Sequence, residues 1–400
     1  MNNRSNGTPG LRTLAVHAGQ TPDPAYGAIA TPIVATSAFS YGDFDSGAAR
    51  FAGTNPGYLY SRFANPTVTA LEDKMAALED GERAVAFASG MAAICSTLLA
   101  VLSAGDELVH VGTLYGGTEG VMRTLLPRLG ISATHVATVE ELESALTART
   151  RLVFVETPDN PLLGIVDLER VARIAAARGI VSVADNTFAT PCITRPLTLG
   201  FDLVVHSATK FIGGHGDATG GIAVGNVQWI DKVRSVGLKQ FGGCLSPHEA
   251  SLLIRGLKTL PLRVEAASTT AAQLASWLVG QPGVARVLYP GLADHPGHAV
   301  AQRQMRSYGA VMSIELAGGR PAARAFLDGL RLVTQAVSLG DTDSLACHPA
   351  STTHSAVDPA IREQYGISEG LVRLSVGIED ADDLQADLAQ ALARVAALAT

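Results

Sequence analysis

Short apolar runs alternate with stretches of helical periodicity from about residue 65 onward. Apolar runs separated by helices are typical of a parallel sheet that is covered by helices on both faces. The pattern therefore predicts a large α/β domain over residues 65–260, with ligands bound beyond the carboxyl ends of its strands. The predicted strands are 84–88, 107–111, 152–155, 180–184, 203–205 and 222–224, and the predicted helices include 121–129, 140–148 and 168–178.

Capping residues mark where two helices begin. Asn65 and Pro66 form an N-cap followed by proline at the first helical position, and Gly81 provides a stop. The segment 246–249, Ser-Pro-His-Glu, has the form of a capping box and predicts a helix to about residue 260. A second helical tract, 262–279, then opens a smaller α+β domain over residues 261–400. Its predicted strands are 311–316, 332–337 and 372–376, and a closing helix is predicted at 382–398.

The first 64 residues differ from the rest of the chain in composition and in hydrophobic pattern. They are rich in Gly, Pro, Thr, Ser and Tyr and show no sustained periodicity. Such a segment has little core of its own. We expect an extended arm that lies on another surface, either within the chain or on a neighbouring subunit.

Composition and charge narrow the class of protein. Of the 400 residues, 47% are hydrophobic and 17% charged, which is enough apolar surface to exclude general disorder. The formal charge of −7 repels a phosphate backbone, so we expect no nucleic-acid partner. The polar first ten residues lack the apolar core of a signal peptide, and the longest apolar stretch, 91–102, is too short to span a membrane. Four widely separated cysteines fit a reducing compartment, so we expect a cytoplasmic protein.

Candidate chemistry lies at the ends of the predicted strands. Asp185 follows one apolar run, and Lys210 follows the next run along the chain. The segment 89–91, Ser-Gly-Met, lies between a strand and a helix, and Tyr115 lies at another strand-to-helix junction. Because parallel strands end at the same edge of a sheet, these side chains should converge.

These residues meet the requirements of one cofactor, pyridoxal 5'-phosphate. Its aldehyde forms a Schiff base with a lysine amine, and its ring nitrogen needs a carboxylate that keeps it protonated. Lys210 and Asp185 can supply these two groups. A helix N-terminus with nearby hydroxyls suits its phosphate, and an aromatic side chain can stack on its ring. The candidates for these contacts are Ser89, Gly90, Met91, Ser207 and Thr209 for the phosphate, and Tyr115 for the ring.

Three other patterns do not support a competing chemistry. The glycine-rich segment 213–217 lacks the ending of a phosphate-binding loop, and no G-x-S-x-G nucleophile elbow is present. His295 with His298, and His348 with His354, could be taken as metal-binding pairs. No third ligand follows either pair at a familiar spacing, so we predict no metal site.

Three segments, 60–67, 88–93 and 207–210, together resemble the Cys/Met-metabolism enzymes that use pyridoxal phosphate. The similarity runs from residue 16 to the last helix. The resemblance implies the type I, aspartate aminotransferase-like fold, with a cofactor-binding large domain, a smaller C-terminal domain and an N-terminal arm over 1–64. It also implies that the arm contacts the neighbouring subunit, where Tyr60 and Arg62 complete the phosphate site. The implied assembly is a homotetramer built from two dimers.

The same resemblance implies roles for individual residues. Lys210 is the implied Schiff-base lysine, Asp185 the partner of the ring nitrogen, and Tyr115 both the stacking residue and an acid. Arg373 matches the arginine that binds the carboxylate of an amino-acid substrate, a task suited to its planar fork. The residues that line up near the same site are Ser338 and Asn160.

Within the family, segments 237–239, 338–341, 348–351 and 365–373 resemble the methionine γ-lyases. That resemblance implies γ-elimination of L-methionine to methanethiol, 2-oxobutanoate and ammonia. Gly117 departs from it, because methionine γ-lyases commonly carry a cysteine there and relatives acting on cystathionine or O-acylhomoserine often carry glycine. Cystathionine γ-lyase, cystathionine γ-synthase and O-acylhomoserine sulfhydrylase therefore remain alternatives. A non-catalytic relative that binds amino acids or partners is a further alternative, although Lys210, Asp185, Tyr115 and Arg373 are all present.

Overall fold

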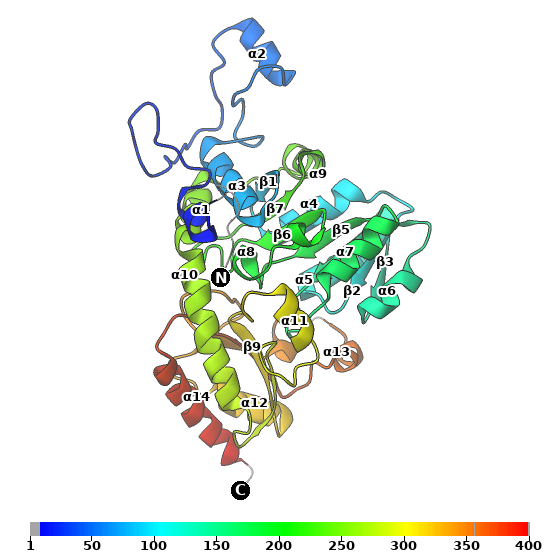
Figure 1. Ribbon diagram of the computed structural model, residues 1–400, viewed down its shortest axis with the longest axis vertical. Coiled ribbons are helices and arrows are strands. Elements are labelled where there is room, and N and C mark those ends of the chain that lie inside the picture. The colour runs from blue at the N-terminus through cyan, green and yellow to red at the C-terminus, as the bar shows by residue number, and fades with distance from the viewer. Residues whose placement is uncertain (1–8, 356, 399–400) are drawn as a thin grey trace.

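A computed structural model describes residues 9–355 and 357–398 of the chain. The polar segment 1–8, where the predicted arm begins and where no signal peptide is expected, lies outside the described residues. The rest folds around two sheets, and the long helix α10, Pro247–Leu278, runs from one to the other (Figure 1).

The larger sheet has seven strands in the order β1-β7-β6-β5-β4-β2-β3. Its order and pairing confirm a mainly parallel sheet, in which only β7 runs antiparallel to its neighbours β1 and β6. The parallel strands β4, β5 and β6 therefore end at a common edge. The strands are β1 Arg83–Phe87, β2 Glu107–Val111, β3 Ser132–Val136, β4 Thr150–Glu156, β5 Val181–Asp185, β6 Leu203–Ser207 and β7 Gly221–Gly225.

The predicted apolar runs coincide with every strand of this sheet except β3, to within two residues at each end. In β3, Ser132, Thr134 and His135 interrupt the apolar pattern. The strand lies at the edge of the sheet and is only partly covered. An edge strand needs no continuous apolar run, and this is why the pattern did not reveal it.

Helices cover both faces of the larger sheet (Figure 1). One face packs against α4 and α9 around buried side chains such as Phe87, Phe154 and Ile230. The other face packs against α3, α6, α7 and the first half of α10. Burial on both faces explains why the central strands are continuous apolar runs. The bounds of the other helices are α3 Pro66–Glu79, α4 Gly90–Val101, α6 Val139–Ala145, α7 Leu168–Ala177 and α9 Val227–Arg234.

The smaller sheet has five strands in the order β10-β11-β12-β9-β8. The second half of α10, together with α12 and α14, covers one face through a core that includes Leu274, Phe326 and Leu388. The predicted strands β9 and β12 are confirmed, β10 is shorter than predicted, and the half-exposed β8 and the short β11 were missed. The elements are β8 Val284–Leu288, α11 His298–Gln304, β9 Val311–Leu316, α12 Gly319–Leu327, β10 Thr334–Gln335, β11 Leu345–Cys347, η5 Pro349–Ser351, α13 Pro359–Tyr365, β12 Leu371–Ser375 and α14 Ala381–Ala396.

The helix break predicted between residues 260 and 262 is wrong, because α10 continues through Pro261. A proline inside a helix removes one backbone hydrogen bond. Leu257, Leu260 and Val264 are buried on either side of it, and their packing keeps the two halves in line. The predicted boundary between the domains therefore falls inside a single helix.

Two other helix predictions change in detail. Ser246 caps α10 by accepting from the backbone N–H of His248 at 3.2 Å, but Glu249 accepts from Thr219 N at 2.8 Å and does not complete a capping box. The predicted helix 121–129 is a π-helical turn followed by a 3-10 turn that contains Pro127. None of the helices in the described ranges combines the length and apolarity that crossing a bilayer requires. The short elements are α5 Gly116–Gly120, η1 Val121–Leu125, η2 Leu126–Leu129, α8 Thr190–Ile193, η3 Pro196–Leu199 and η4 Ser235–Gln240.

The predicted arm is not extended throughout, because it contains α1, Leu11–His17, and α2, Phe44–Phe51. Helix α1 packs against α3 and α10, and the buried Lys74 Nζ of α3 donates to the carbonyl oxygens of Ala15 (2.9 Å) and Val16 (3.2 Å). Beyond α1, the chain up to about residue 60 projects from the body (Figure 1). Tyr26 and Phe44 are 90% and 86% exposed there.

Replacing Lys74 with Met should loosen α1 without disturbing the sheets. The substitution keeps the apolar length of the side chain but removes both bonds to the end of α1, each worth about 1 kcal/mol. Amide exchange in residues 11–17 should therefore become about tenfold faster or more, while exchange in β4 and β5 stays as in the wild type. Unchanged exchange in α1, measured by mass spectrometry, would contradict this account of the docking.

Candidate active site

A cavity of about 280 Å³ lies where the ends of β4, β5 and β6 meet the first turn of α4 and, from the smaller sheet, Arg373 of the central strand β12. Most of the predicted site residues converge on it, although they are spread over nearly 300 positions of the chain. The predicted residues that line the cavity are Ser89, Gly90, Met91, Tyr115, Asn160, Asp185, Ser207, Thr209, Lys210 and Arg373.

Lys210 follows β6 and brings a primary amine to the cavity. Its Nζ donates to Ser338 Oγ at 3.2 Å, and this bond joins the larger sheet to the segment between β10 and β11. Burial, followed by the positive charge of Arg373, lowers the pKa of Lys210, while Asp341 acts in the opposite direction. The neutral, nucleophilic amine is therefore available at lower pH than in a solvated lysine.

Two buried carboxyls stand side by side at the strand ends. Asp185 ends β5 and is the register partner of Glu156, which ends β4. Burial, followed by the charge of Asp185, raises the pKa of Glu156 well above its usual range. Burial also raises the pKa of Asp185, but Thr187 opposes that rise by donating to Asp185 Oδ1 from both its hydroxyl (2.6 Å) and its backbone N–H (3.0 Å). Thr187 therefore makes ionisation of Asp185 easier, whereas burial and the neighbouring charge of Asp185 both make ionisation of Glu156 harder.

Glu156 also positions the loop that carries Tyr115. Its Oε2 accepts from the backbone N–H of Tyr115 at 2.7 Å. The Tyr115 side chain remains 41% exposed and lines the cavity. An ideal Cβ at Gly117 would lie only 2.5 Å from Tyr115 Cε1, so the ring lies across the space that a side chain at position 117 would occupy.

The first turn of α4 forms a cradle for an anion. Ser89 is the N-cap and accepts from Ala92 N at 3.1 Å, while the N–H groups of Gly90 and Met91 have no carbonyl within the helix to bond. A Cβ at Gly90 would lie 2.8 Å from Ser207 Cβ, so glycine permits the helix to approach β6 this closely. Thr209 also lines the cavity, although its hydroxyl already bonds the backbone of Gly220. The helix dipole and these donors favour a phosphate.

Arg373, on β12, presents a buried guanidinium from the smaller sheet. Its Nη1 donates to Asn160 Oδ1 (2.9 Å), and its Nη2 donates to the carbonyl oxygens of Val337 (2.8 Å) and Ser338 (3.1 Å). These bonds fix the plane of the guanidinium at the cavity wall. A fixed planar fork of this kind is suited to a carboxylate.

Tyr60 and Arg62 do not join the other predicted residues within one chain. Arg62 Nη1 donates to the carbonyl oxygens of Lys239 (2.6 Å) and Leu238 (3.2 Å), and its guanidinium lies over the Phe63 ring. Neither Tyr60 nor Arg62 lines the cavity. Within one chain, these two residues therefore do not reach a group bound in the cavity.

Several residues at the cavity were not identified from the sequence. The clearest omission is Glu156, which follows the predicted run 152–155 just as Asp185 follows the next run. Reading the strand ends systematically would have found it. Thr187 was also missed, although it stands two residues after Asp185 at the same strand end. The others are Ile94, Phe188, Thr219, Val337, Leu339 and Thr353, which show no distinctive local signal.

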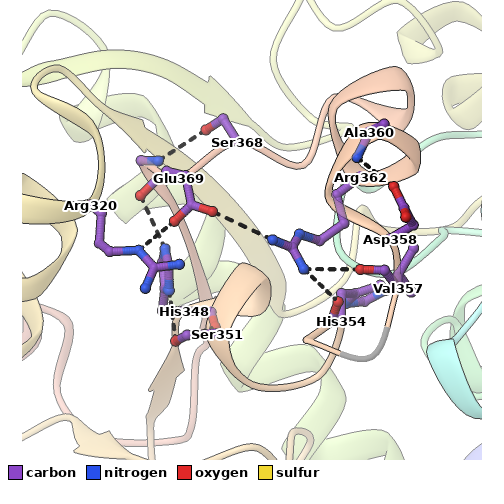
Figure 2. A network of polar contacts seen from close by, with 11 residues as sticks. Arg320, His348, Ser351, His354, Val357, Asp358, Ala360, Arg362, Ser368 and Glu369 are labelled. Carbon is purple, nitrogen blue, oxygen red and sulfur yellow. Dashed lines mark hydrogen bonds and ion pairs between the residues drawn. The ribbon is translucent and has the colours of Figure 1, made fainter.

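Thr353 lines the cavity and belongs to the segment between β11 and β12, which contains a network of polar contacts (Figure 2). Glu369 accepts from Arg320 Nε at 2.6 Å and lies 3.6 Å from Arg362 Nη2. The hydrogen bond from Arg320 holds the pKa of Glu369 below its usual value. Arg362 in turn donates to the carbonyl oxygen of Val357 at 3.0 Å. The histidines that could be taken as metal pairs have other partners here: His348, for example, bonds Ser351 Oγ and the Glu369 carbonyl.

The donor set fits pyridoxal 5'-phosphate. An amine, the Asp185 carboxyl, an aromatic ring and an anion cradle closed by Gly90 surround one cavity, and these are the groups that the cofactor requires. Across the described parts of the chain, no group of three or more His, Cys, Asp or Glu is placed to hold a metal ion. The fold and the site together define a pyridoxal-phosphate-dependent enzyme of the aminotransferase-like fold.

Residues 12–393 match the family described as Cys/Met metabolism PLP-dependent enzyme, and the chain belongs to this family. It is 49% identical to an L-methionine γ-lyase of Pseudomonas putida, with 97% of this chain and 98% of the relative covered. It is 43% identical to an O-succinylhomoserine sulfhydrylase of Pseudomonas aeruginosa, with 95% and 94% covered. A crystal structure of cystathionine γ-synthase from Xanthomonas oryzae superposes with a TM-score of 0.93 at 42% identity, covering 98% of this chain and all of that one. The family confirms the predicted fold and cofactor, while its members differ in substrate.

The lowered pKa of Lys210 predicts how attachment of the cofactor depends on pH. Because the native group is neutral at lower pH than a solvated lysine, the rate at which apoenzyme binds pyridoxal phosphate should rise through a midpoint below 10.5, the ordinary value. Replacing Arg373 with Gln removes a nearby positive charge and should move that midpoint upward. Stopped-flow absorbance across pH measures both midpoints, and identical midpoints in the two proteins would contradict the electrostatic explanation.

Proposed function

We propose that this enzyme catalyses γ-elimination of L-methionine, in which one water is consumed and methanethiol, 2-oxobutanoate and ammonia are released. The observation that carries the proposal is the convergence of Lys210, Asp185, Tyr115 and Arg373 on one cavity of about 280 Å³. Relatives named as methionine γ-lyases, including the one from Pseudomonas putida, support the choice of substrate.

In this proposal the residues that line the cavity would hold the cofactor. Asp185 would pair with its ring nitrogen, the first turn of α4 with Ser207 and Thr209 would bind its phosphate, and Tyr115 would stack on its ring. When bound, pyridoxal phosphate supplies an aldehyde that condenses with amines and a protonated ring that accepts the electron pair of a breaking bond. The remaining chemistry falls to side chains of the protein.

Arg373 and Lys210 act on the substrate from opposite ends. The guanidinium of Arg373 binds the α-carboxylate and fixes the Cα–H bond relative to the Lys210 amine. Lys210 removes the proton from Cα as a general base; once its amine has released that proton, it accepts the second proton, from Cβ. The electron pair released at Cβ expels the sulfur from Cγ as the C–S bond breaks.

Tyr115 is the proposed acid for the departing sulfur. A departing thiolate carries a full negative charge in a cavity that is only partly open to water, so proton transfer to it lowers the barrier. The Tyr115 hydroxyl is the acid assigned to this step, because its ring lines the cavity and its backbone is fixed by Glu156.

The proposed assembly is a homotetramer built from two dimers. The projecting arm exposes Tyr26, Phe44 and Phe51 by 90%, 86% and 70%, which leaves apolar surface for a second copy of the chain to cover. A second chain would also bring Tyr60 and Arg62 to the phosphate of its neighbour. This supports an active site that is completed only in the dimer.

A second candidate function is favoured by one position. Gly117 leaves room for the Tyr115 ring, and the relatives include an O-succinylhomoserine sulfhydrylase and a cystathionine γ-synthase with similar coverage. The alternatives are therefore cystathionine γ-lyase, cystathionine γ-synthase and O-acylhomoserine sulfhydrylase. They use the same proton transfers at Cα and Cβ and differ in the group that leaves or adds at Cγ.

Parallel assays with three substrates decide between these functions. Purified enzyme is given L-methionine, cystathionine or O-acetylhomoserine with a thiol, and 2-oxobutanoate and sulfur products are measured. We expect the highest kcat/KM for methionine, and we expect Lys210→Ala to lose both the visible absorbance of the bound cofactor and nearly all turnover. Formation of 2-oxobutanoate from cystathionine but not from methionine would reject the first function and leave the Lys210 assignment intact.

Gly117→Cys tests how position 117 affects substrate choice. The added side chain displaces the Tyr115 ring and narrows the cavity, so kcat/KM for the larger cystathionine should fall at least fivefold more than kcat/KM for methionine. Gly120→Cys is the matched control, because a Cβ at Gly120 meets no atom within 4 Å. Equal effects of Gly117→Cys on both substrates would show that this position does not select between them.

A further inference from the structure

The proposed cofactor contacts depend on the spacing of two strand ends. Asp185 ends β5 and faces the ring nitrogen, whereas Ser207 ends β6 and faces the phosphate. Thr187 links these ends directly: its hydroxyl donates to Asp185 Oδ1 (2.6 Å) and accepts from the backbone N–H of Ser207 (2.8 Å). These two hydrogen bonds hold the ends of β5 and β6 at a fixed spacing on the side that faces the cavity.

A second link joins the residues next to them. Glu79 Oε1 accepts from Asn186 Nδ2 at 2.8 Å, and His206 Nε2 lies 2.7 Å from the same oxygen and donates to it. Asn186 follows Asp185, and His206 precedes Ser207. Because neighbouring residues of a strand point to opposite faces, Glu79 joins the strand ends from the face opposite Asp185 and Ser207. One carboxylate oxygen therefore bridges the same two strands that Thr187 bridges from the cavity side.

A negative charge on Glu79 is costly in free energy unless hydrogen bonds compensate for its burial. The residue is completely buried and is the last residue of α3, where the helix dipole disfavours a negative charge. Its second oxygen, Oε2, and His206 Nδ1 are buried without a hydrogen-bond partner among the described residues. The stabilising contacts of the carboxylate are thus concentrated on Oε1, the atom that spans β5 and β6.

We propose that Glu79 is a positioning residue for the cofactor, which acts through Asn186 and His206 to hold the ends of β5 and β6 at the spacing that pyridoxal phosphate requires. This inference rests on the proposed function, in which Asp185 and Ser207 contact the cofactor. Glu79 touches neither cofactor nor substrate. Its effect is transmitted by two hydrogen bonds and by the backbone bond from Asn186 N to Val205 O, 3.0 Å long.

Removing the hydrogen bonds of Glu79 should weaken binding of the cofactor and change its orientation in the site. Glu79→Ala holoenzyme, dialysed against graded pyridoxal phosphate, should show a Kd at least tenfold higher than the wild type. At saturating cofactor, its induced circular dichroism in the visible region should fall by half or more. Glu79→Gln keeps an oxygen that accepts from both donors, so its Kd should lie within threefold of the wild type and its circular dichroism should be retained.

Glu72→Ala is the matched control for a purely structural effect. Glu72 is a buried glutamate of the same helix, but it accepts from Ala86 N (2.9 Å) and Arg234 Nη2 (2.6 Å), away from the cavity. The Glu72→Ala substitution should lower the melting temperature of the enzyme yet leave the cofactor Kd within twofold of the wild type. A folded Glu79→Ala enzyme with unchanged Kd and circular dichroism overturns the proposal, as does a Glu79→Gln enzyme that is as impaired as Glu79→Ala.

Two further variants keep the test decisive. If Glu79→Ala does not fold, Asn186→Ala removes one hydrogen bond of the bridge and leaves Glu79 bonded to His206. The Kd of Asn186→Ala for pyridoxal phosphate should rise threefold or more, and an unchanged Kd overturns the proposal.

Asp185→Ala is the reference for the proposed function. If Asp185→Ala leaves binding and circular dichroism unchanged, the proposed site is wrong; if it alters both while Glu79→Ala alters neither, only the positioning role is wrong.

Discussion

The structure depends on one constraint: ionisable groups brought together at the buried edge of a parallel sheet must each find a partner. Asp185 and Glu156 occupy register positions on adjacent strands, where two free carboxylates would repel each other in a medium of low dielectric constant. Thr187 donates to Asp185 and opposes the rise in its pKa, whereas burial and the charge of Asp185 both raise the pKa of Glu156. Asp185 is therefore the better suited of the two carboxyls to face a protonated ring nitrogen.

The same constraint explains why the second sheet is needed. Lys210 and Arg373 are both cationic in water, and each becomes useful only when it is held and partly desolvated. Lys210 donates a hydrogen bond to Ser338, while Arg373 donates hydrogen bonds to Asn160 and to two backbone carbonyl oxygens. Helix α10 continues unbroken through Pro261 and packs against both sheets, so it fixes these partners relative to each other.

The relatives of this chain are named for different substrates, although they match it over nearly its whole length. In the proposed function, the strand ends and the first turn of α4 bind the cofactor, and the space around Tyr115 and Gly117 would face the leaving group. Gly117 packs against the Tyr115 ring and not against Glu156, Asp185 or Thr187. Under this proposal, a side chain added at position 117 would alter substrate choice without touching those carboxyls.

The sequence by itself determined the central strands, the cofactor and most of the residues at the cavity. Strands buried on both faces must be continuous apolar runs, and Asp185 and Lys210 stand out because polar residues follow such runs. Edge strands such as β3 gave no such signal, and Glu156 was overlooked although it ends a strand in the same way. The sequence pattern predicted two helices separated at Pro261, because the rule that proline interrupts a helix takes no account of the buried side chains that pack on either side of it.

Only the tertiary structure decided which distant residues meet. Glu79 carries no local mark of function, yet it lies against the ends of β5 and β6 because α3 packs on that face of the sheet. Lys210 and Ser338 are joined across the two sheets by a contact that no local pattern specifies. Hydrogen bonds between segments far apart in the chain depend on how the layers pack, and a sequence read locally contains no measure of that packing.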